Sequence, residues 1–368
     1  MKFSYKRLDE LGSVSRGRSK HRPRNAPELY GGPYPFVQTA DVKKAGLYLT
    51  EYSQTYSEKG LAQSKLWPKG TLCITIAANI ADTAILGVDA CFPDSVIGFI
   101  SDDSKSNVKY VKYLFDYTLQ TEFKKFSQGA AQDNLSQEKL LSIKLPVPDV
   151  EFQNRIVAIL SDYDSAIDNA RRQIALLEEA AMRLYREWFV VHADPKWEKK
   201  TFGAFAKVAR GRVITKATAH RGEVPVVAAG LSPAYFTEKA NVKAPSVTIS
   251  ASGANAGYVW YHANDIWASD CSYLSKNETP YVYFSYAFLK THSAILKGLQ
   301  KGSAQPHVHG SDIEGISFFV PGDDLVRQYE MIVNPVFQKI GVNEKLIASL
   351  TEARDRLLPK LMSGEVSV

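Results

Sequence analysis

Two long stretches of the chain carry apolar residues in a heptad pattern. In the first, an apolar residue or alanine recurs at alternating steps of four and three, at Ile156, Leu160, Tyr163, Ile167, Ala170, Ile174, Leu177, Ala181, Leu184 and Trp188. The second has the same spacing, at Tyr329, Val333, Val336, Ile340, Asn343, Ile347, Leu350, Arg354, Leu357 and Leu361. An average step of about 3.5 residues is typical of a coiled-coil seam. The pattern therefore predicts two long helices.

The length of these helices indicates what they pack against. A helix from Ile156 to Trp188 would be about 50 Å long at about 1.5 Å per residue, which is longer than a small domain is wide. This length argues against the alternative of a core helix packed only into its own domain. Because the first helix must deliver the chain to a second module, we expect the two helices to pack against each other in antiparallel orientation.

Three residues qualify the second helix. Asn343 and Arg354 stand in the seam where the first helix has Ala170 and Ala181, and polar seam residues fix register and partner at a cost in stability. Pro335 lacks a backbone donor and disfavours helical geometry in the residue before it. We expect either a kink or the true start of the helix at Pro335.

The remaining chain has the character of two globular domains. Short β-branched and aromatic runs, such as residues 71–78 and 247–251, are broken by Gly and Pro, a pattern that predicts strands between turns. We therefore expect an α+β protein in which two globular α/β domains are joined by two long antiparallel coiled-coil helices with pseudo-twofold symmetry. The predicted boundaries are 1–148 for the first domain, 149–194 for the first helix, 195–320 for the second domain, and 321–368 for the second helix and tail.

An internal repeat supports this division. Residues 129–184 align without a gap to residues 302–357, and 15 of these 56 pairs are identical. Two copies at a long period indicate a duplicated module, whereas a solenoid needs at least three short repeats.

Composition narrows the class of protein. The 368 residues, 45% of them hydrophobic, suffice for two cores, and no apolar run is long enough for a membrane span. The first residues lack the apolar segment of a signal peptide, so we expect a cytoplasmic protein that does not bind membranes. The three cysteines, Cys73, Cys91 and Cys271, are too scattered for a zinc site or a disulfide framework. We expect no metal and no cofactor in this chain.

Charge is distributed unevenly along the chain. The predicted domains carry formal charges of +5 and +6, whereas the segments 149–194 and 321–368 carry −4 and −1. Positive charge confined to the globular modules is expected if each module binds a polyanion separately.

A basic loop opens each module. Arg-Gly-Arg occurs at residues 16–18 and again at 210–212, and further basic residues follow it in the sequence each time. Such loops can follow phosphates, and arginine can read guanine edges bidentately. A solvated surface loop is the alternative, but its recurrence in both modules favours nucleic acid. The candidate DNA-binding residues here are Arg16, Arg18, Lys20, Arg22 and Arg24 in the first module and Arg210, Arg212, Lys216 and Arg221 in the second.

A second repeated element contains glutamine. Gly-Ala-Ala-Gln ends at Gln132 and Gly-Ser-Ala-Gln at Gln305. Ser136 and Ser311 follow as predicted helix caps, the latter within a capping-box pattern. The amide side chains suit adenine edges or phosphate, and a structural turn explains the repeat equally well. We include Gln132, Gln305 and the nearby His307 among the candidate DNA-binding residues.

Taken together, these motifs resemble the specificity subunit of Type I restriction-modification systems. The tail Arg-Leu-Leu-Pro-Lys-Leu-Met-Ser-Gly-Glu-Val at residues 356–366 also resembles that family. The resemblance implies two target-recognition domains that each read half of a bipartite site in double-stranded DNA, and two helices that act as a ruler. It also implies docking of two modification (methyltransferase) subunits and of restriction subunits, which would hold S-adenosylmethionine, ATP and Mg²⁺. Residues 18–71 have no clear partner in the second module, as expected if the halves read different sequences.

Two other classes of function remain as alternatives. A stand-alone restriction endonuclease or DNA methyltransferase would need catalytic motifs. The nearest methyltransferase-like motif, Ser-Pro-Ala-Tyr at residues 232–235, lacks a glycine-rich turn for the methyl donor. We therefore expect a non-enzymatic subunit with no catalytic residues. A coiled-coil scaffold with incidental basic domains is the other alternative.

Overall fold

The computed structural model describes residues 3–77, 81–126, 136–302, 305–366 and 368. The chain divides into two compact units, unit 1 (Met1–Asp168 with Ala348–Val368) and unit 2 (Asn169–Ile347). Each long helix is thus shared between both units. The predicted domain boundaries, which assign each helix to a segment of its own, stay a prediction.

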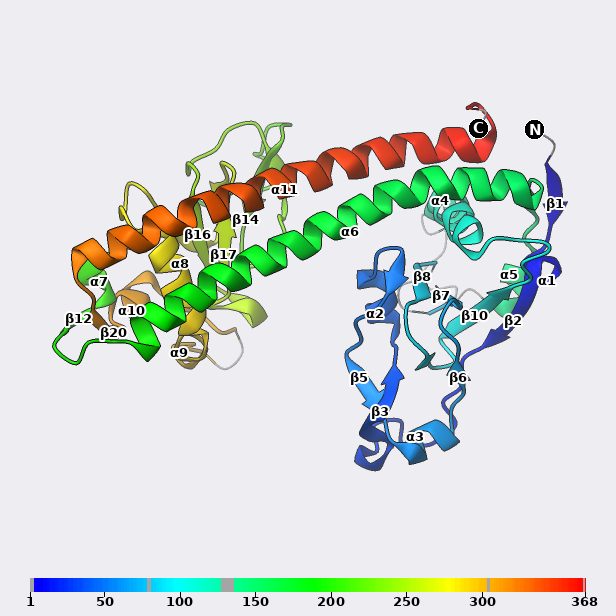
Figure 1. Cartoon of the computed structure of the whole chain (residues 1–368), viewed down its shortest axis with the longest axis horizontal. Coiled ribbons are helices and arrows are strands. Elements are labelled where there is room, and N and C mark those ends of the chain that lie inside the picture. The colour runs from blue at the N-terminus through cyan, green and yellow to red at the C-terminus, as the bar shows by residue number, and fades with distance from the viewer. Residues whose placement is uncertain (1–2, 78–80, 127–135, 303–304, 367) are drawn as a thin grey trace. The chain divides into compact units, whose positions relative to one another are not determined.

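Unit 1 contains two main sheets and a helical cover (Figure 1). Its strands are β1 (Ser4–Lys6), β2 (Gly12–Arg16), β3 (Tyr30–Phe36), β4 (Tyr48–Leu49), β5 (Gln54–Tyr56), β6 (Leu66–Trp67), β7 (Leu72–Thr75), β8 (Thr83–Leu86), β9 (Ala90–Cys91), β10 (Val96–Ser101) and β11 (Leu145–Val147). Its shorter helices are α1 (Leu8–Leu11), α2 (Thr39–Lys44), α3 (Glu58–Ala62), α4 (Val108–Phe126) and α5 (Gln137–Ser142). The sheets have strand orders β2-β10-β7-β8-β4 and β5-β3-β9-β6, and β1 pairs with β11.

Unit 2 repeats this plan with fewer strands. Its strands are β12 (Glu198–Thr201), β13 (Ala209–Arg210), β14 (Val224–Val227), β15 (Tyr235–Thr237), β16 (Ser246–Ser250), β17 (Val259–His262), β18 (Trp267–Ala268), β19 (Cys271–Ser275) and β20 (Ser317–Val320). Its shorter helices are α7 (Phe202–Phe205), α8 (Val282–Thr291), α9 (Ser293–Gly298) and α10 (Gly310–Glu314). The sheets are β13-β19-β16-β17, β15-β14-β18 and β12-β20.

Each strand in the two main sheets of unit 2 has a counterpart in unit 1, where β4 and β6 are additional. The order β2-β10-β7-β8 corresponds to β13-β19-β16-β17, and all of these neighbours are antiparallel. The small sheets match too, because β3 is antiparallel to β5 and parallel to β9, as β14 is to β15 and β18. The segment after the first basic loop has no clear counterpart in the sequence of the second module. Its strands nevertheless pair in the same way as the strands after the second basic loop.

The long helices are α6 (Val150–Arg186), which ends in a π-helical turn (Glu187–Val191), and α11 (Asp323–Ser363). Within unit 2, the Tyr329 hydroxyl of α11 donates to the Ala181 carbonyl of α6, and Asn343 of α11 bonds to Gln173 of α6. Within unit 1, Arg354 of α11 bonds to Asp164 of α6. Along these contacts the residue numbers rise on one helix and fall on the other. The two helices are therefore antiparallel, as predicted. Every predicted seam residue is buried or half-buried.

The ends of both helices also pack into the cores of the two units. The alternative that the helices are core helices is therefore correct for these ends. In unit 1, Ile156 and Leu160 of α6 and Leu361 of α11 share a cluster with Phe99 and Leu114. In unit 2, α8 lies between the sheet and the helix pair, and all residues from Val282 to Leu289 are buried. Its Phe284 packs with Tyr185 of α6 and Tyr329 of α11.

One of the two alternatives for Pro335 is excluded, and the kink stays a prediction. The helix begins at Asp323, so Pro335 is not its start. The turns before Pro335 are stabilised by packing, because Tyr329 and Val333 are buried in the core of unit 2.

Candidate nucleic-acid interface

The two Arg-Gly-Arg loops leave equivalent strands. Arg16 is the last residue of β2 and pairs with Ile97 of β10. Arg210 is the last residue of β13 and pairs with Ser272 of β19. Since β2 and β13 hold the same edge position in matching sheets, each unit presents its basic loop at the same place in its fold.

The central residue of each loop must be glycine, because the backbone of a neighbouring segment passes too close to it for a side chain. Gly17 N–H donates to Val96 O at 2.8 Å, and a Cβ at Gly17 would lie 2.2 Å from the carbonyl oxygen of Pro93. In unit 2, Gly211 N–H donates to Cys271 O at 2.8 Å, and a Cβ there would lie 2.3 Å from Ser269 O. No other residue fits without moving the neighbouring backbone.

The second arginine of each loop is held by its backbone. Its N–H donates to Phe92 O in unit 1 and, from Arg212, to Ala268 O in unit 2, both at 2.9 Å. Its carbonyl accepts a side-chain bond at 2.7 Å, from the Ser64 hydroxyl to Arg18 and from the Trp267 indole to Arg212. The backbone of both loops is thus fixed and the side chains point outward, since both arginines are exposed.

In unit 1, most of the predicted arginines are used to hold the loop itself. Arg16 Nε donates to Asp94 O at 3.0 Å, and Arg24 pairs with the Asp94 carboxylate at 2.9 Å. Arg22 donates to the carbonyls of Ser19 and His21 at 2.8 Å.

Arg18 and Lys20 differ from these arginines. Both side chains are exposed, and no partner is found for either among the described residues. Gln63 fixes the backbone here, because its Oε1 accepts from the N–H groups of Lys20 (2.6 Å) and His21 (3.0 Å). Arg18 and Lys20 are therefore held in place with their charges available.

In unit 2, all four predicted cations are available. Arg210, Arg212, Lys216 and Arg221 are exposed, and within the described part of the chain none of their side chains meets an acid or a carbonyl. The acid near this loop, Asp270, accepts instead from the Ser252 hydroxyl at 2.5 Å.

The glutamine turns are only partly described. Gln132 lies outside the described residues. Gln305 is exposed, and Gly302 before it has φ of +94°. Ser136 caps α5 as predicted, accepting from Lys139 N–H at 3.1 Å. Ser311 is not a cap, because α10 starts one residue earlier and the Glu314 carboxylate binds Val208 N–H at 2.8 Å.

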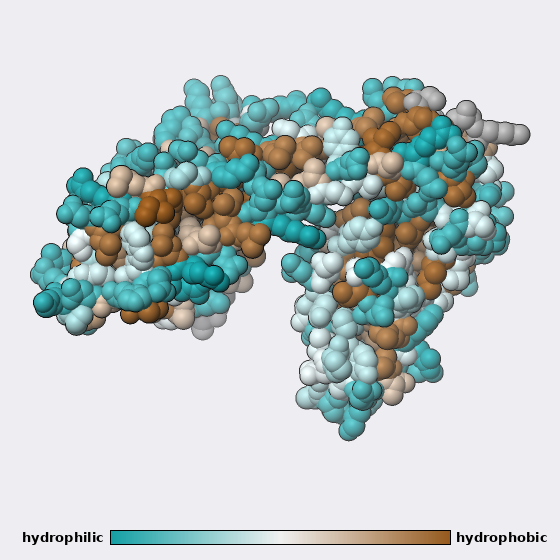
Figure 2. Space-filling view, in the orientation of Figure 1, coloured by the Kyte–Doolittle hydropathy of each residue, from teal (hydrophilic) through white to brown (hydrophobic). Residues whose placement is uncertain are grey.

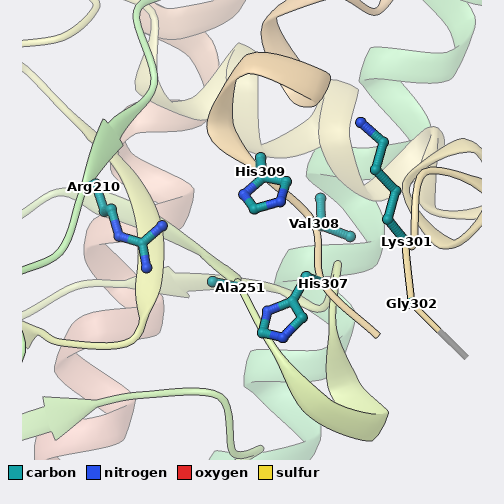
Figure 3. A pocket seen from close by; sticks show the side chains of 7 residues that line it. All are labelled: Arg210, Ala251, Lys301, Gly302, His307, Val308 and His309. Carbon is teal, nitrogen blue, oxygen red and sulfur yellow. The ribbon is translucent and has the colours of Figure 1, made fainter. Parts of the chain in front are cut away.

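A pocket of about 390 Å³ in unit 2 brings two predicted residues together. Arg210 and His307 line it with Lys301 and His309, and Gln305 is not among the lining residues (Figure 3). The sequence analysis missed Lys301 and His309. The signal for His309 is the alternation His-Val-His around buried Val308, which places both imidazoles on one side of an extended segment.

Potential metal ligands and reactive side chains do not gather in the described part of the chain. No group of three His, Cys, Asp or Glu among them could hold a metal ion. All three cysteines are buried, and burial raises their pKa values. His262 bonds to Thr248 Oγ1 at 2.8 Å, and burial lowers its pKa to about 3, as fits a structural role. No helix in the described part of the chain could cross a membrane.

Comparison with known proteins decides the family. Residues 2–179 and 195–352 each match the family described as the Type I restriction modification DNA specificity domain. The chain belongs to this family. It is a DNA-recognition subunit of a type I restriction-modification complex, and no finding supports the alternative of a stand-alone nuclease or methyltransferase.

Individual relatives of this specificity subunit agree. The type I restriction enzyme MjaIX specificity subunit of Methanocaldococcus jannaschii is 25% identical over 412 residues, covering 100% of this chain and 94% of the relative. A type I specificity subunit of Mycoplasma genitalium is 23% identical over 277 residues, covering 71% and 72%. The crystal structure of a type I S subunit from M. genitalium has the same fold, with TM-score 0.60 and 18% identity over 98% of this chain and 96% of that one.

Proposed function

We propose that each unit reads one half of a bipartite site in double-stranded DNA, with its basic loop as the contact element. The observation that carries this proposal is the recurrence of the Arg-Gly-Arg loop at the same strand end in both units. In both loops the glycine lies against neighbouring backbone, and the carbonyl of the second arginine accepts a side-chain hydrogen bond. A fixed backbone that presents unpaired cations suits a polyanion, because the side chains need not break internal bonds to bind phosphates or base edges.

The loops divide their residues between two roles. In unit 1, Arg18 and Lys20 contact DNA, and Arg16, Arg22 and Arg24 hold the loop in shape. In unit 2, Arg210, Arg212, Lys216 and Arg221 all contact DNA. Gln305 and His307 extend the contact surface of unit 2, and Gln132 remains a candidate for unit 1.

The chain is non-catalytic and works through its partners. Two modification subunits dock on or beside α6 and α11, since the repeat offers two related surfaces, and restriction subunits join the complex. Exposed apolar side chains on these helices, including Leu176 (65% exposed), Met331 (69%) and Val342 (55%), support docking there. Figure 2 shows apolar residues gathered over the part of α6 and α11 that belongs to unit 2. S-adenosylmethionine, ATP and Mg²⁺ belong to the partner subunits. The complex acts in the prokaryotic cytoplasm.

The test is half-site recognition by the complex with its modification subunits. Arg210→Ala with Arg212→Ala should weaken or relax recognition of one half-site, and Arg18→Ala with Lys20→Ala that of the other. Methylation of a library randomised in both half-sites measures this. Lys69→Ala and Lys297→Ala, at exposed lysines outside the loops, are the matched controls.

Two results would contradict the proposal. Equal loss of specificity at both half-sites would show that the units are not separate readers. Methylation or cleavage by the purified chain alone, with methyl donor and Mg²⁺, would show that it is an enzyme itself.

A further inference from the structure

The pocket in unit 2 is lined by hydrogen-bond donors that come from separate parts of the fold. Arg210 ends β13, and His307 and His309 lie about 100 residues later, before α10. None of the described lining residues carries a carboxylate. Lys301 also lines the pocket, but its ammonium pairs with Asp312 at 2.7 Å. The groups available to a ligand are therefore the Arg210 guanidinium and the two imidazoles.

The backbone holds the two histidines rigidly. His307 and Lys301 exchange both backbone bonds, N–H of Lys301 to His307 O at 2.9 Å and N–H of His307 to Lys301 O at 2.8 Å. Val308 N–H donates to Ala251 O at 3.0 Å, and its side chain is buried. The two imidazole rings lie 6.4 Å apart and nearly parallel, at 10°. The pocket is therefore built before any ligand arrives, which reduces the ordering cost of binding.

Figure 3 shows the Arg210 guanidinium and both imidazoles around one open space, with the Lys301 ammonium farther off. A guanidinium forks onto two oxygens of a phosphate, and an imidazole N–H adds a further donor. The major-groove edges of adenine and cytosine present donors, and the described lining contains no carboxylate or amide side chain to receive them. Guanine presents two acceptors there, N7 and O6, whereas a phosphate presents oxygens to all three donors of the pocket.

We propose that this pocket binds one backbone phosphate of the half-site read by unit 2. This inference rests on the proposed function, and it assigns Arg210 to the DNA backbone and leaves base reading to other residues such as Arg212. The sequence of unit 1 has no matching imidazoles, because Asn134 and Ser136 stand at the positions of His307 and His309. Ser136 is used there as the cap of α5, and Arg16 is bonded to Asp94 O.

The test measures binding of the reconstituted complex to its site as a function of salt and of single base substitutions. Arg210→Gln should weaken binding about tenfold or more, as expected for loss of a hydrogen bond to a charged group. It should also reduce the slope of log K against log salt by about 0.9. Relative preference at every base position should stay unchanged. Arg210→Lys should keep the slope but still bind more weakly, because the fork is lost.

The histidines give a second, independent measurement. His309→Ala, at an exposed side chain outside the backbone bridge, should weaken binding to all sequences by the same factor, and Lys297→Ala should change nothing. A relaxed preference at one base in the Arg210 or His309 variants would overturn the phosphate assignment, as would unchanged affinity in both. Failure of the proposed function would appear separately, as absence of a specific site for the unaltered complex.

Discussion

At the scale of single residues, the two basic loops differ mainly in one acidic neighbour. Asp94 binds Arg16 through its carbonyl and Arg24 through its carboxylate, so the first loop is partly neutralised. Asp270, the acid beside the second loop, is bonded to Ser252 instead. The second loop therefore presents more uncompensated positive charge, and a DNA complex should depend on salt more steeply through unit 2 than through unit 1.

Glu330 makes the stability of unit 2 depend on pH. Its carboxyl accepts Phe284 N–H of α8 at 2.6 Å, and burial raises its pKa to about 7 from 4.5. A raised pKa means that the folded state binds the proton more tightly. This contribution to stability is complete below pH 4.5 and is lost as the pH rises to 7.

Glu330→Gln should therefore stabilise unit 2 above pH 7 and have little effect near pH 4.5. The amide oxygen can still accept from Phe284 and carries no charge. We expect a gain of about 1–2 kcal/mol, because one pKa unit corresponds to about 1.4 kcal/mol and water screens part of the effect. Urea unfolding between pH 4.5 and 8 measures it. A difference between variant and parent that does not change with pH would contradict the assignment.

The sequence predicts some of these residues and misses others for a physical reason. The internal repeat is enough to find the Arg-Gly-Arg loops, because in both copies only glycine fits against the neighbouring backbone. It cannot show that Arg24 is bound by Asp94, because those residues are 70 positions apart and meet only after β2 pairs with β10. Lys301 was missed for a different reason. It lines the pocket because its backbone bonds to that of His307, and backbone bonds leave no signal in the sequence of side chains.

At the scale of secondary structure elements, the long helices are the most predictable part of the chain, because burial along a seam imposes a period on the sequence. The extent of α11 is less predictable. A proline within a helix removes one bond and costs about 3 kcal/mol, but burial of Tyr329 and Val333 stabilises the turns before Pro335. Pro335 and Met331, the residue that loses its bonding partner, are both exposed, so water can satisfy the free carbonyl.

The polar seam residue Arg354 gives a testable stability effect. It donates to Asp164 at 2.5 Å, and Asp164, only 7% exposed, also accepts from the Tyr113 hydroxyl of α4. Arg354→Ala leaves a buried carboxylate without its cation, so we expect a loss of about 3–5 kcal/mol in the unfolding free energy. Arg354→Leu combined with Asp164→Leu should recover most of it. Thermal and urea unfolding measure both.

Arg356 provides the matched control, because it pairs with Glu352 at 2.7 Å on the exposed side of the same helix. Arg356→Ala should cost less than about 0.5 kcal/mol. If the two arginine variants were equally stable, the Asp164 pair would not be a structural link between α11 and α6 within unit 1.

At the scale of the whole molecule, duplication explains why fold class was predictable and recognition was not. The helices and the strand exits keep matching residues in both copies, because the seam constrains them. The segments after the basic loops keep only their topology, β5-β3-β9 in one unit and β15-β14-β18 in the other. No packing rule links their side chains to a base sequence, so the recognised bases do not follow from the pattern.

The ruler role that the family resemblance implies predicts the effect of lengthening the helices. One heptad inserted after Asp168 and one after Ile347 would fall at opposite points of the antiparallel pair and leave the contacts within each unit intact. Seven residues add about 10 Å at about 1.5 Å each, which is about three base pairs. Binding to the native site should be lost, and either a longer spacer or no specific site should be found.

Methylation of a library with varied spacers measures this, with a single insertion in α6 alone as the control that breaks the seam. A folded double-insertion variant that still modifies the native site with unchanged spacing would show that the helices do not set the distance.

The division of the chain into units also governs the order in which it can fold on the ribosome. Unit 2 is one unbroken segment, whereas unit 1 needs residues 348–368 to cover Ile156 and Leu160 with Leu361 and Met362. After Asp168 is made, translation of the remaining chain takes about 10–40 s at about 5–20 residues per second. For that time the apolar start of α6 lacks its cover, so the unit synthesised first is completed last, and the nascent chain exposes a surface that a chaperone would bind.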